Sequence, residues 1–355
     1  MSGLLELTAE LVDIPSVSHN ERAITDHLHD ILRGVPWLEV TRVGENLVAR
    51  TSLGRDRRLL LAGHTDTVPP NGNEAARIVD DELWGIGACD MKGGVAVLAE
   101  LARTVPEPSV DVTYVFYECE EIDARFNGIE RLFRERPDLL QADAAILAEP
   151  TAARVEAGCQ GTLRARLTYR GVRAHSARPW LGRNAIHRLG PDLAALAAYE
   201  GRFVEIDGCT FRESLQAVFV DGGVAGNVVP DSAVLTVNHR FAPDRTPEEA
   251  AASVREVLGG ADEFHVVDHA VAAPPSLGHP LLTSLLVAID RPAEAKLGWT
   301  DVARFAARGV PATNFGPGDP NLAHHADERV SRADLETVYS VLKTLLERAD
   351  QHTGA

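Results

Sequence analysis

The fold can be argued from one stretch of the sequence, Arg58-Leu59-Leu60-Leu61-Ala62-Gly63-His64-Thr65-Asp66. Its first six residues form a short, nearly all-apolar run, which is typical of a strand covered on both faces in a mostly parallel sheet. Val112–Tyr117 and Ala144–Ala148 have the same character. Alternation of such strands with helices is typical of an α/β domain. Apolar residues at helical spacing occur in Leu4–Val12, Ile24–Leu32 and Gly94–Thr104.

Each predicted strand runs directly into side chains that can bind metal ions. In open α/β sheets the ligand crevice lies outside the carboxyl ends of the strands, so these groups are expected to converge. Each one alone is more often an ordinary loop residue, and only their joint placement indicates a site. Converging carboxylates need a cation, and zinc accepts imidazole as well as carboxylate. The residues are His64 and Asp66, then Glu118, Glu120 and Glu121, and finally Glu149.

A glycine-rich stretch, Trp84–Gly94, carries Asp90 just before the helix predicted from Gly94. Its glycines allow close backbone approach at a crowded turn. A phosphate-binding loop is the alternative interpretation, but the spacing matches neither G-x-G-x-x-G nor the Walker pattern. The sequence also lacks the G-x-S-x-G elbow of a serine hydrolase.

Composition and charge narrow the class of protein. A length of 355 residues suggests two domains. The formal net charge of −17 disfavours nucleic acid and anionic membranes as partners. We see no export signal and no apolar run long enough to span a bilayer, so we expect a cytoplasmic protein. Free thiols are expected at the four widely spaced cysteines, Cys89, Cys119, Cys159 and Cys209.

From Thr162 the pattern changes to β-α-β-β-α-β, the ferredoxin-like order. We therefore predict an inserted α+β domain over 162–275, and a catalytic metal-binding domain formed by 1–161 and 276–355. Thr246 is a good N-cap for the second helix of the insert. The other expected elements are strands at Leu163–Tyr169, Leu215–Asp221, Val234–Phe241 and Glu263–Asp268, a helix at Asn184–Tyr199, and a final helix at Ser331–Glu347.

Seven motifs then carry a resemblance that covers nearly the whole chain. In order and spacing they resemble the two-zinc aminoacylase/carboxypeptidase family. The resemblance implies a zinc-peptidase-like catalytic domain, hydrolysis of a linear amide, and an inserted domain that acts as a lid and forms a homodimer. The motifs are His64–Pro69, Gly85–Gly94, Glu120-Glu121, Ala148–Pro150, Gly171–Ala177, Gly226–Pro230 and Ala323–Glu328.

The resemblance also implies a ligand set. Asp90 would bridge two Zn²⁺ ions, with His64 and Glu149 completing one site and Glu121 and His324 the other. Co²⁺ is expected to be able to substitute for Zn²⁺.

Two adjacent histidines, His324 and His325, could supply the last ligand. The family's ligand histidine stands four residues before a glutamate, here Glu328, so His324 is preferred and His325 is expected on the solvent side.

Two carboxylates next to the ligands receive roles from the same resemblance. Asp66 would orient the ring of His64 without binding a metal ion itself. Glu120 would be the general base, because metal ions lower the pKa of a bound water towards about 7. Glu118, one residue closer to the strand, is the alternative base.

Residues further along the chain resemble the family's substrate-contacting positions. His175, in the inserted domain, would help to stabilise the oxyanion from the partner subunit. Asn227, Arg240, Arg178 and Gly318 are the candidate substrate-binding residues, and Arg240 is suited to a bidentate grip on a carboxylate.

Four local runs resemble one branch of the family, the actinobacterial succinyl-diaminopimelate desuccinylases. The implied reaction is N-succinyl-LL-2,6-diaminopimelate plus water giving succinate and LL-2,6-diaminopimelate, in lysine and diaminopimelate biosynthesis. Another family deacylase or peptidase, such as an N-acetylornithine deacetylase, is the first alternative, and a non-catalytic metal-holding protein is the second. The runs are Val155–Thr162, Trp180–His187, Gly298–Phe305 and Gly316–Pro320.

One departure affects the acyl group. Enterobacterial desuccinylases have arginines where this chain has Cys159 and Gln160. The succinyl carboxylate must then find another cation, for which Arg164, Arg178 and Arg240 are the candidates.

Overall fold

The computed structural model describes residues 3–348 and divides them into two compact units. Unit 1 runs to Gly158 and includes Pro275–Glu294 and the chain from Thr300 on. Unit 2 comprises Cys159–Pro274 and Ala295–Trp299. Met1 and Ser2, on which the expected absence of an export signal partly depends, lie outside the described residues.

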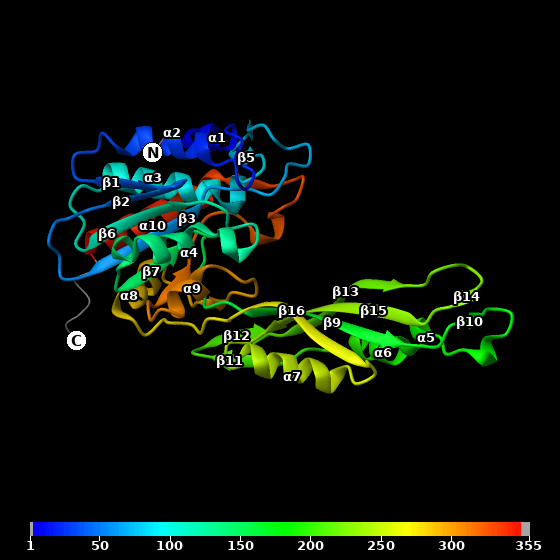
Figure 1. Ribbon diagram of the computed structural model, residues 1–355. Helices are drawn as coiled ribbons and strands as arrows, with labels where there is room; N and C mark the ends of the chain where they lie inside the picture. Colours follow the sequence, from blue (N-terminus) through cyan, green and yellow to red (C-terminus); the bar gives the residue numbers. More distant parts are fainter. Residues whose placement is uncertain (1–2, 349–355) are drawn as a thin grey trace. The chain divides into compact units, whose positions relative to one another are not determined.

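The central sheet of unit 1 has the strand order β1-β2-β6-β3-β7-β18-β8, with the short β17 beyond β8 (Figure 1). The four inner strands are parallel, and β1, β2 and β8 are antiparallel to their neighbours. The mostly parallel sheet predicted from the sequence is therefore present. The bounds are β1 (Glu39–Val43), β2 (Asn46–Arg50), β3 (Arg58–His64), β6 (Asp111–Tyr117), β7 (Ala144–Leu147), β8 (Glu156–Ala157), β17 (Glu294–Ala295) and β18 (Ala312–Asn314).

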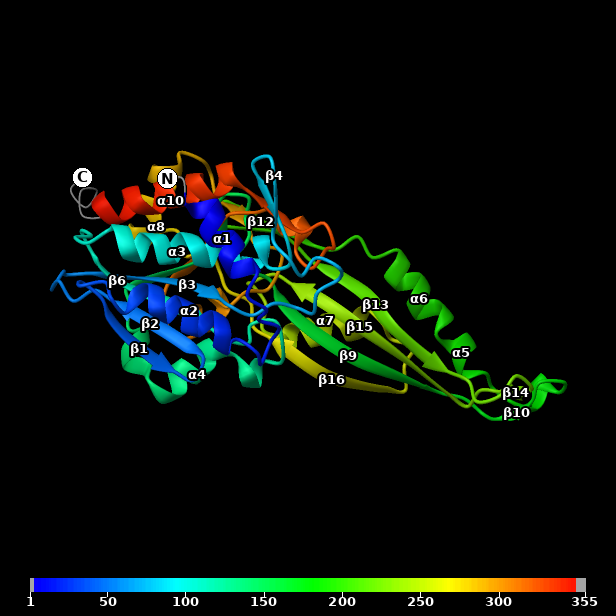
Figure 2. The same ribbon diagram turned by 90° about the horizontal axis from the view of Figure 1, so that it is seen from above.

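Helices cover both faces of this sheet, with α1, α2, α3 and α10 on one face and α4 and α9 on the other (Figures 1 and 2). This burial on both faces explains why β3, β6 and β7 are almost wholly apolar. The helices are α1 (Leu4–Val12), α2 (Arg22–Leu32), α3 (Gly93–Thr104), α4 (Gly128–Glu135), α8 (Pro280–Ile289), α9 (Val302–Ala306) and α10 (Arg332–Arg348). A small sheet holds β4 (Arg77–Val79), β5 (Glu82–Trp84) and β19 (Arg329–Ser331).

The start of α3 packs directly against the end of β7. A Cβ added to Gly94 would lie 2.3 Å from the carbonyl oxygen of Ala148, so only glycine permits this approach. The close contact brings the segment that carries Asp90 to the carboxyl ends of the parallel strands.

Unit 2 is an antiparallel sheet of order β13-β15-β9-β16 with helices packed on it (Figure 2). Its core consists of apolar side chains such as Leu163, Leu167 and Leu235, which alternate with polar ones along β9 and β15. The β-α-β-β-α-β order predicted for this region is present. Its elements are β9 (Gly161–Arg170), β10 (Ala174–His175), α5 (Ala185–Arg188), α6 (Gly190–Ala197), β11 (Phe203–Ile206), β12 (Cys209–Arg212), β13 (Ser214–Gly222), β14 (Val228–Val229), β15 (Ser232–Phe241), α7 (Pro247–Val257) and β16 (Glu263–Ala270).

Two details of unit 2 differ from the prediction. The single helix expected over Asn184–Tyr199 is wrong: it is split into α5 and α6, because Pro191 has no N–H to continue the hydrogen bonding across the break. The hairpin of β11 and β12 was not predicted, although its turn residues, Asp207 and Gly208, both have positive φ and are a common two-residue hairpin turn.

The four cysteines are free and buried, as predicted. Within residues 3–348, no helix combines the length and the apolar character needed to cross a membrane.

Candidate metal centre and catalytic residues

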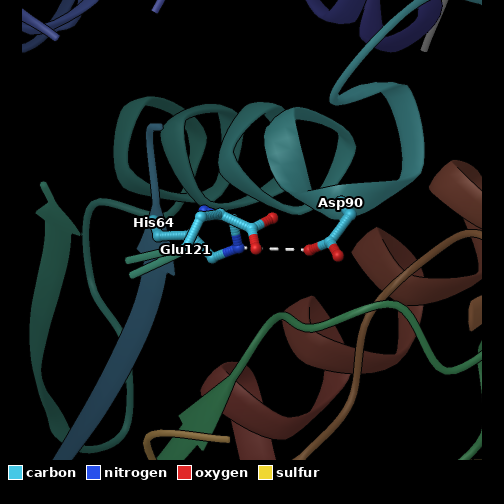
Figure 3. A group of neighbouring side chains, drawn as sticks. All are labelled: His64, Asp90 and Glu121. Atoms are coloured by element: carbon cyan, nitrogen blue, oxygen red, sulfur yellow. Dashed lines mark hydrogen bonds and ion pairs between the residues drawn. The ribbon is translucent and has the colours of Figure 1, made fainter. Parts of the chain in front are cut away.

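Three predicted ligands meet at the carboxyl end of the parallel strands (Figure 3). His64 ends β3, Asp90 precedes α3 and Glu121 follows β6, and one ligand atom from each lies within 4.8 Å of the others. The Nε2 atom of His64 is 3.1 Å from Oδ1 of Asp90. His324 joins this group, because its Nε2 atom is 2.9 Å from Oε1 of Glu121 and 3.5 Å from Oδ2 of Asp90.

The pKa values of these side chains show that the cluster favours bound positive charge. Burial opposes protonation of His64, but its hydrogen bonds with Asp66 and Asp90 outweigh burial and raise its pKa well above 6.5. Hydrogen bonds with Asp90 and Glu121 raise the pKa of His324 to about 10. Burial opposes ionisation of Asp90, yet the two histidines hold its pKa low. Divalent cations bind these same imidazole and carboxylate atoms in place of protons, so the donor set fits zinc.

Glu149, the fifth predicted ligand, follows β7 and is buried. It does not belong to the group of three that lies within 4.8 Å. Its negative charge is nevertheless close enough to raise the pKa of Glu120. Glu149 therefore lies beside the cluster, near Glu120.

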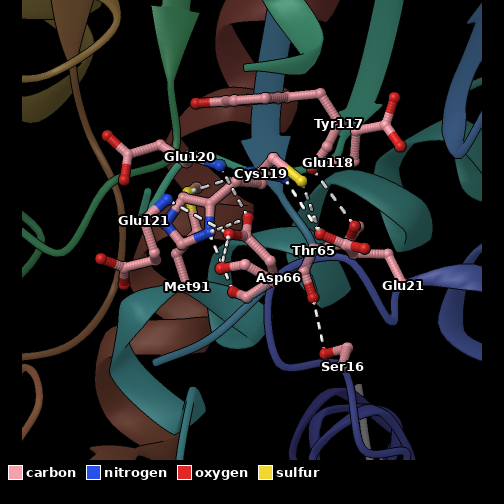
Figure 4. A network of polar contacts seen from close by, with 12 residues as sticks. Ser16, Glu21, Thr65, Asp66, Met91, Tyr117, Glu118, Cys119, Glu120 and Glu121 are labelled. Carbon is pink, nitrogen blue, oxygen red and sulfur yellow. Dashed lines mark hydrogen bonds and ion pairs between the residues drawn. The ribbon is translucent and has the colours of Figure 1, made fainter. Parts of the chain in front are cut away.

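Asp66, which lies next to Glu120 and Glu121 in Figure 4, connects the loop after β6 to the ring of His64. Its carboxylate accepts hydrogen bonds from the backbone N–H groups of Glu120 and Glu121, at 2.9 and 3.1 Å. Oδ1 is also 3.4 Å from Nδ1 of His64, and the hydroxyl of Ser18 donates to Oδ2 at 2.7 Å. Burial opposes ionisation, but these partners hold the pKa of Asp66 low. Nδ1 of His64 also hydrogen-bonds with the backbone carbonyl of Asp66, at 3.1 Å, so Asp66 contacts the ring through both its backbone and its carboxylate.

The structure distinguishes Glu120 from Glu118, the two candidate bases. Oε1 of Glu118 accepts from Nδ2 of Asn46 at 2.8 Å and from Nη1 of Arg131 at 3.0 Å, so this carboxylate is engaged in a structural network. Desolvation raises the pKa of Glu120 well above its ordinary value. The nearby charge of His64 lowers this pKa, whereas the charges of Asp301 and other carboxylates raise it. A carboxyl group with a raised pKa is suited to accept and return a proton. The arrangement favours Glu120.

Sequence reasoning missed Glu21, which holds the turn between the candidate base and β6 (Figure 4). The side chain is buried, and its Oε1 accepts from the N–H of Cys119 at 3.1 Å and from that of His19 at 3.0 Å. Burial raises the pKa of Glu21. Cys119 itself has a φ of 57°, so the backbone turns sharply at this point. No sequence pattern connects Glu21 with a turn almost a hundred residues away.

Glu328 and Gly318 contact the segment that carries Asp90. Oε1 of Glu328 accepts from the N–H groups of Cys89 and Asp90, each at 3.1 Å, and burial raises its pKa to about 7. A Cβ added to Gly318, whose φ is 87°, would lie 2.5 Å from Cβ of Cys89. Both residues therefore position Asp90. The peptide bond that follows Asp90 is cis.

His324 and His325 are both exposed, but they make different contacts. His325 is exposed, and its carbonyl oxygen accepts from Asn73 at 3.1 Å and from the N–H of Glu328 at 3.1 Å. Its backbone therefore supports the loop, while His324 turns towards Glu121.

The candidate residues of unit 2 fall into two places. His175, Arg178 and Asn227 lie together at one end of the unit: the N–H of Ser176 donates to the carbonyl of Asn227 at 2.8 Å, and that of Arg178 donates to His175 at 2.8 Å. All three side chains belong to exposed residues.

Arg240 lies at the other end of β15, where it lines a cavity of about 300 Å³ together with Gln160 and Arg212. Burial lowers the pKa of Arg240, which forms no ion pair within residues 3–348. Gln160 donates from its Nε2 to the carbonyl of Arg212 at 2.8 Å. A partly desolvated guanidinium in a polar cavity is suited to bind an anion.

A mostly parallel sheet that gathers imidazole and carboxylate ligands at its C-terminal edge, beside a carboxylate base, defines a metal-dependent hydrolase. Residues 60–348 match the sequence profile of Peptidase family M20/M25/M40. The chain therefore belongs to this family, and it is a metal-dependent amide hydrolase, as predicted.

Two curated relatives are similar over almost their whole length. A Mycobacterium tuberculosis protein, to which the name succinyl-diaminopimelate desuccinylase is provisionally attached, is 53% identical over 96% of this chain and 97% of its own. The succinyl-diaminopimelate desuccinylase of Corynebacterium glutamicum is 47% identical over 96% and 95%.

Solved structures show the same fold. Aminopeptidase PepT of Bacillus cereus superposes with a TM-score of 0.79 at 20% identity, covering 98% of each chain. The Bacillus subtilis YXEP protein, described as a dinuclear metal-binding peptidase, gives 0.70 at 16% identity over 97% of each chain.

Proposed function

We propose that this protein hydrolyses N-succinyl-LL-2,6-diaminopimelate to succinate and LL-2,6-diaminopimelate, in the cytoplasm, as a step of lysine and diaminopimelate biosynthesis. The observation that carries the proposal is the identity of 53% and 47% with two proteins named for this reaction, over 96% of the chain. Four free, buried cysteines agree with a reducing compartment.

We further propose that each subunit holds two Zn²⁺ ions, with Co²⁺ able to substitute. Asp90 would bridge them, His64 and Glu149 would hold one, and Glu121 and His324 the other. The mixed imidazole and carboxylate donors support zinc rather than magnesium. When bound, the ions supply Lewis-acid polarisation of the amide carbonyl and lower the pKa of a water molecule.

The side chains around this centre then perform the proton transfers. Glu120 takes a proton from the attacking water as the new C–O bond forms. It returns this proton to the nitrogen as the C–N bond breaks, so the products are an amine and a carboxylic acid, which then loses its proton to water and leaves as the carboxylate. Asp66 keeps the ring of His64 and the backbone of Glu120 in a fixed relation. His175 donates a hydrogen bond to the oxyanion of the tetrahedral intermediate.

For substrate binding, we assign a cation to the succinyl carboxylate. Arg164 already forms an ion pair with Asp268, which disfavours it. Arg240 and Arg178 have no ion pair among the described residues, and Arg240 is the more desolvated of the two. We therefore propose Arg240 for the carboxylate, with Arg178, Asn227 and Gly318 contacting the rest of the substrate.

We also propose that the protein is a homodimer that pairs through unit 2. β13 is an edge strand of its sheet, and it exposes a run of apolar side chains that includes Phe219, Val220 and, just beyond the strand, Val224. An unpaired, apolar edge of this kind is a surface that pairs readily with another strand. The dimer would bring His175 of one subunit to the centre of the other.

A side-by-side turnover assay on zinc-reconstituted protein tests the substrate. We expect kcat/KM for N-succinyl-LL-2,6-diaminopimelate to exceed that for N-acetylornithine by about a hundredfold or more, because a buried cation left without its carboxylate weakens binding strongly. Arg240→Ala should remove most of this preference, with Arg164→Ala as the matched control. Faster turnover of N-acetylornithine would overturn the substrate assignment and leave the family assignment intact.

A further inference from the structure

Unit 1 has a cavity that none of the predicted metal ligands lines. Its volume is about 470 Å³, within the range that binds small molecules. We call it the hairpin cavity, because residues of the β4–β5 hairpin form part of its wall. Glycine, alanine and tryptophan make up most of the lining, which is typical of a ligand pocket with few polar groups. The lining residues are Gly72, Asn73, Glu74, Ala75, Ala76, Arg77, Trp84, Gly85 and Ala326.

Hydrogen bonds hold the walls of the hairpin cavity, so it is formed before any ligand binds. The carbonyl oxygen of Asn73 accepts from the N–H of Ile86 at 2.8 Å, and Nδ2 of Asn73 donates to the carbonyl of His325 at 3.1 Å. The N–H of Ala76 donates to Oδ1 of Asp13 at 2.7 Å. A preformed cavity loses little conformational entropy on binding.

Two opposite charges line the hairpin cavity without pairing. Glu74 and Arg77 form no ion pair with each other or with any other group among residues 3–348. The guanidinium of Arg77 lies over the ring of Trp84, 5.3 Å from its centroid, and is thereby held at the wall. Arg329 also lies over this ring, at 4.5 Å, but it is paired with Glu82 at 3.3 Å. Among the lining residues, Arg77 is therefore the available cation and Glu74 the available anion.

We propose that the hairpin cavity binds the head group of an α-amino acid, with its carboxylate on Arg77 and its ammonium on Glu74. An aliphatic side chain would then lie against Trp84 and the alanines of the wall. A guanidinium binds a carboxylate through two parallel hydrogen bonds, and a carboxylate accepts from an ammonium group. A simple acid would leave Glu74 without a partner and a simple amine would leave Arg77 without one. A zwitterion is the class of ligand that satisfies both.

Two kinds of molecule carry this head group. One is a free amino acid, and the other is the unsuccinylated end of the proposed substrate. Only the second source rests on the proposed function, because it requires that substrate.

Isothermal titration calorimetry on the zinc-loaded protein tests the class of ligand without turnover. Three probes share one aliphatic chain: L-norleucine carries both charges, hexanoate lacks the ammonium, and pentylamine lacks the carboxylate. We expect L-norleucine to bind about tenfold or more tightly than either of the others. Glu74→Gln and Arg77→Gln should each weaken its binding about tenfold or more. Glu107→Gln and Arg22→Gln, at exposed residues elsewhere in unit 1, are the matched controls and should leave it unchanged.

Tryptophan fluorescence locates the bound amino acid. L-norleucine should change the emission of the wild-type protein, because Trp84 lines the cavity. Trp84→Phe should remove this change while calorimetry still detects binding, since phenylalanine keeps an apolar wall. A change in emission that persists in Trp84→Phe would place the ligand elsewhere and contradict the proposal.

Steady-state kinetics distinguish the two sources of the head group. If the cavity takes a free amino acid, Glu74→Gln and Arg77→Gln leave KM for the succinyl substrate unchanged, and L-norleucine does not compete with this substrate. If the cavity takes the free end of the substrate, both variants raise KM about tenfold with kcat and zinc content unchanged, and L-norleucine competes. If the wild-type protein does not hydrolyse the substrate, the proposed function fails, while calorimetry still reports on the cavity.

Three results of the calorimetry would overturn the proposal. Absence of L-norleucine binding at millimolar concentrations would show that the hairpin cavity does not take this class of ligand. Equal binding of hexanoate or pentylamine would show that only one charge is recognised. Binding that Glu74→Gln or Arg77→Gln leaves unchanged would assign the amino acid to another place, such as the metal centre.

Discussion

The metal cluster of unit 1 and the end of unit 2 that carries His175 hold their candidate side chains in opposite ways. Asp66 is fully buried and fixes its neighbours through four polar contacts, so the cluster is rigid before any ligand arrives. His175, Arg178 and Asn227 are exposed, and only backbone hydrogen bonds relate them to one another. One region is therefore preorganised to bind cations, whereas the other leaves its side chains accessible.

Replacement of the base should have the largest effect. Glu120→Gln is expected to lower kcat by about 10² to 10⁴, because the proton acceptor is lost, while zinc content stays at the wild-type level. Steady-state kinetics and metal analysis on the same preparation provide the measurement. Glu118→Gln is the matched control: it weakens the network with Asn46 and Arg131, so it should lower stability and leave turnover largely intact. Equal losses of turnover in both variants would contradict the assignment of the base.

Removal of the exposed histidine of unit 2 should have the next largest effect. His175→Ala is expected to lower kcat by about 10² to 10³ with little change in zinc content, since a donor to the oxyanion is removed and no ligand is. His187→Ala, an exposed histidine of α5, is the control and should behave like the wild type. Loss of zinc from His175→Ala would show that this residue belongs to the metal centre itself.

Removal of an orienting group should have a smaller effect, on metal affinity. Asp66→Asn keeps the shape of the side chain but removes its charge, and we expect zinc affinity to fall about 10- to 100-fold. Competition with a chromophoric chelator measures this change. Ser18→Ala removes one of the partners of Asp66 and should reduce affinity less. A wild-type affinity in Asp66→Asn would mean that the ring of His64 is held by other contacts.

The smallest effect is expected from a buried histidine of unit 2 that takes no part in the site. His239 is buried, its Nδ1 lies 2.9 Å from the carbonyl of Ser214, and burial lowers its pKa below 6.5. The unfolded chain therefore binds this proton more readily, so His239 adds stability above about pH 6.5 that is lost as the pH falls through its folded pKa. The midpoint temperature of thermal unfolding should fall on acidification. This fall should be smaller by roughly a few degrees in His239→Gln than in the wild type. Identical pH profiles would refute this account.

Much of the cluster could be predicted because it follows from local patterns. The apolar run of β3 ends at His64, and the run of β6 ends before Glu120 and Glu121. Parallel pairing of these strands then places their ends at one edge, as the register of β3 and β6 shows. The break in the helix after Arg188 could also have been found, since Gly190 and Pro191 are a visible signal.

Other features could not be derived from local patterns. Glu21 holds the turn at Cys119, and Glu328 holds the segment of Asp90, across separations of about a hundred and more than two hundred residues. A glutamate in a helix cap or a loop has the same appearance whether it is solvated or buried. Only packing decides which of its oxygens meets a backbone N–H.

The sequence by itself determined the α/β character of the chain, the insertion of a second module, and the residue types that collect at one edge of the sheet, because strand periodicity and ligand chemistry are local properties. The tertiary structure alone decided that Glu118 is bound to Asn46 and Arg131, that Gly318 supports Cys89, and that Trp180 is exposed. Burial and hydrogen-bond partners are created by segments distant in the sequence, and these set the charge and accessibility of each group.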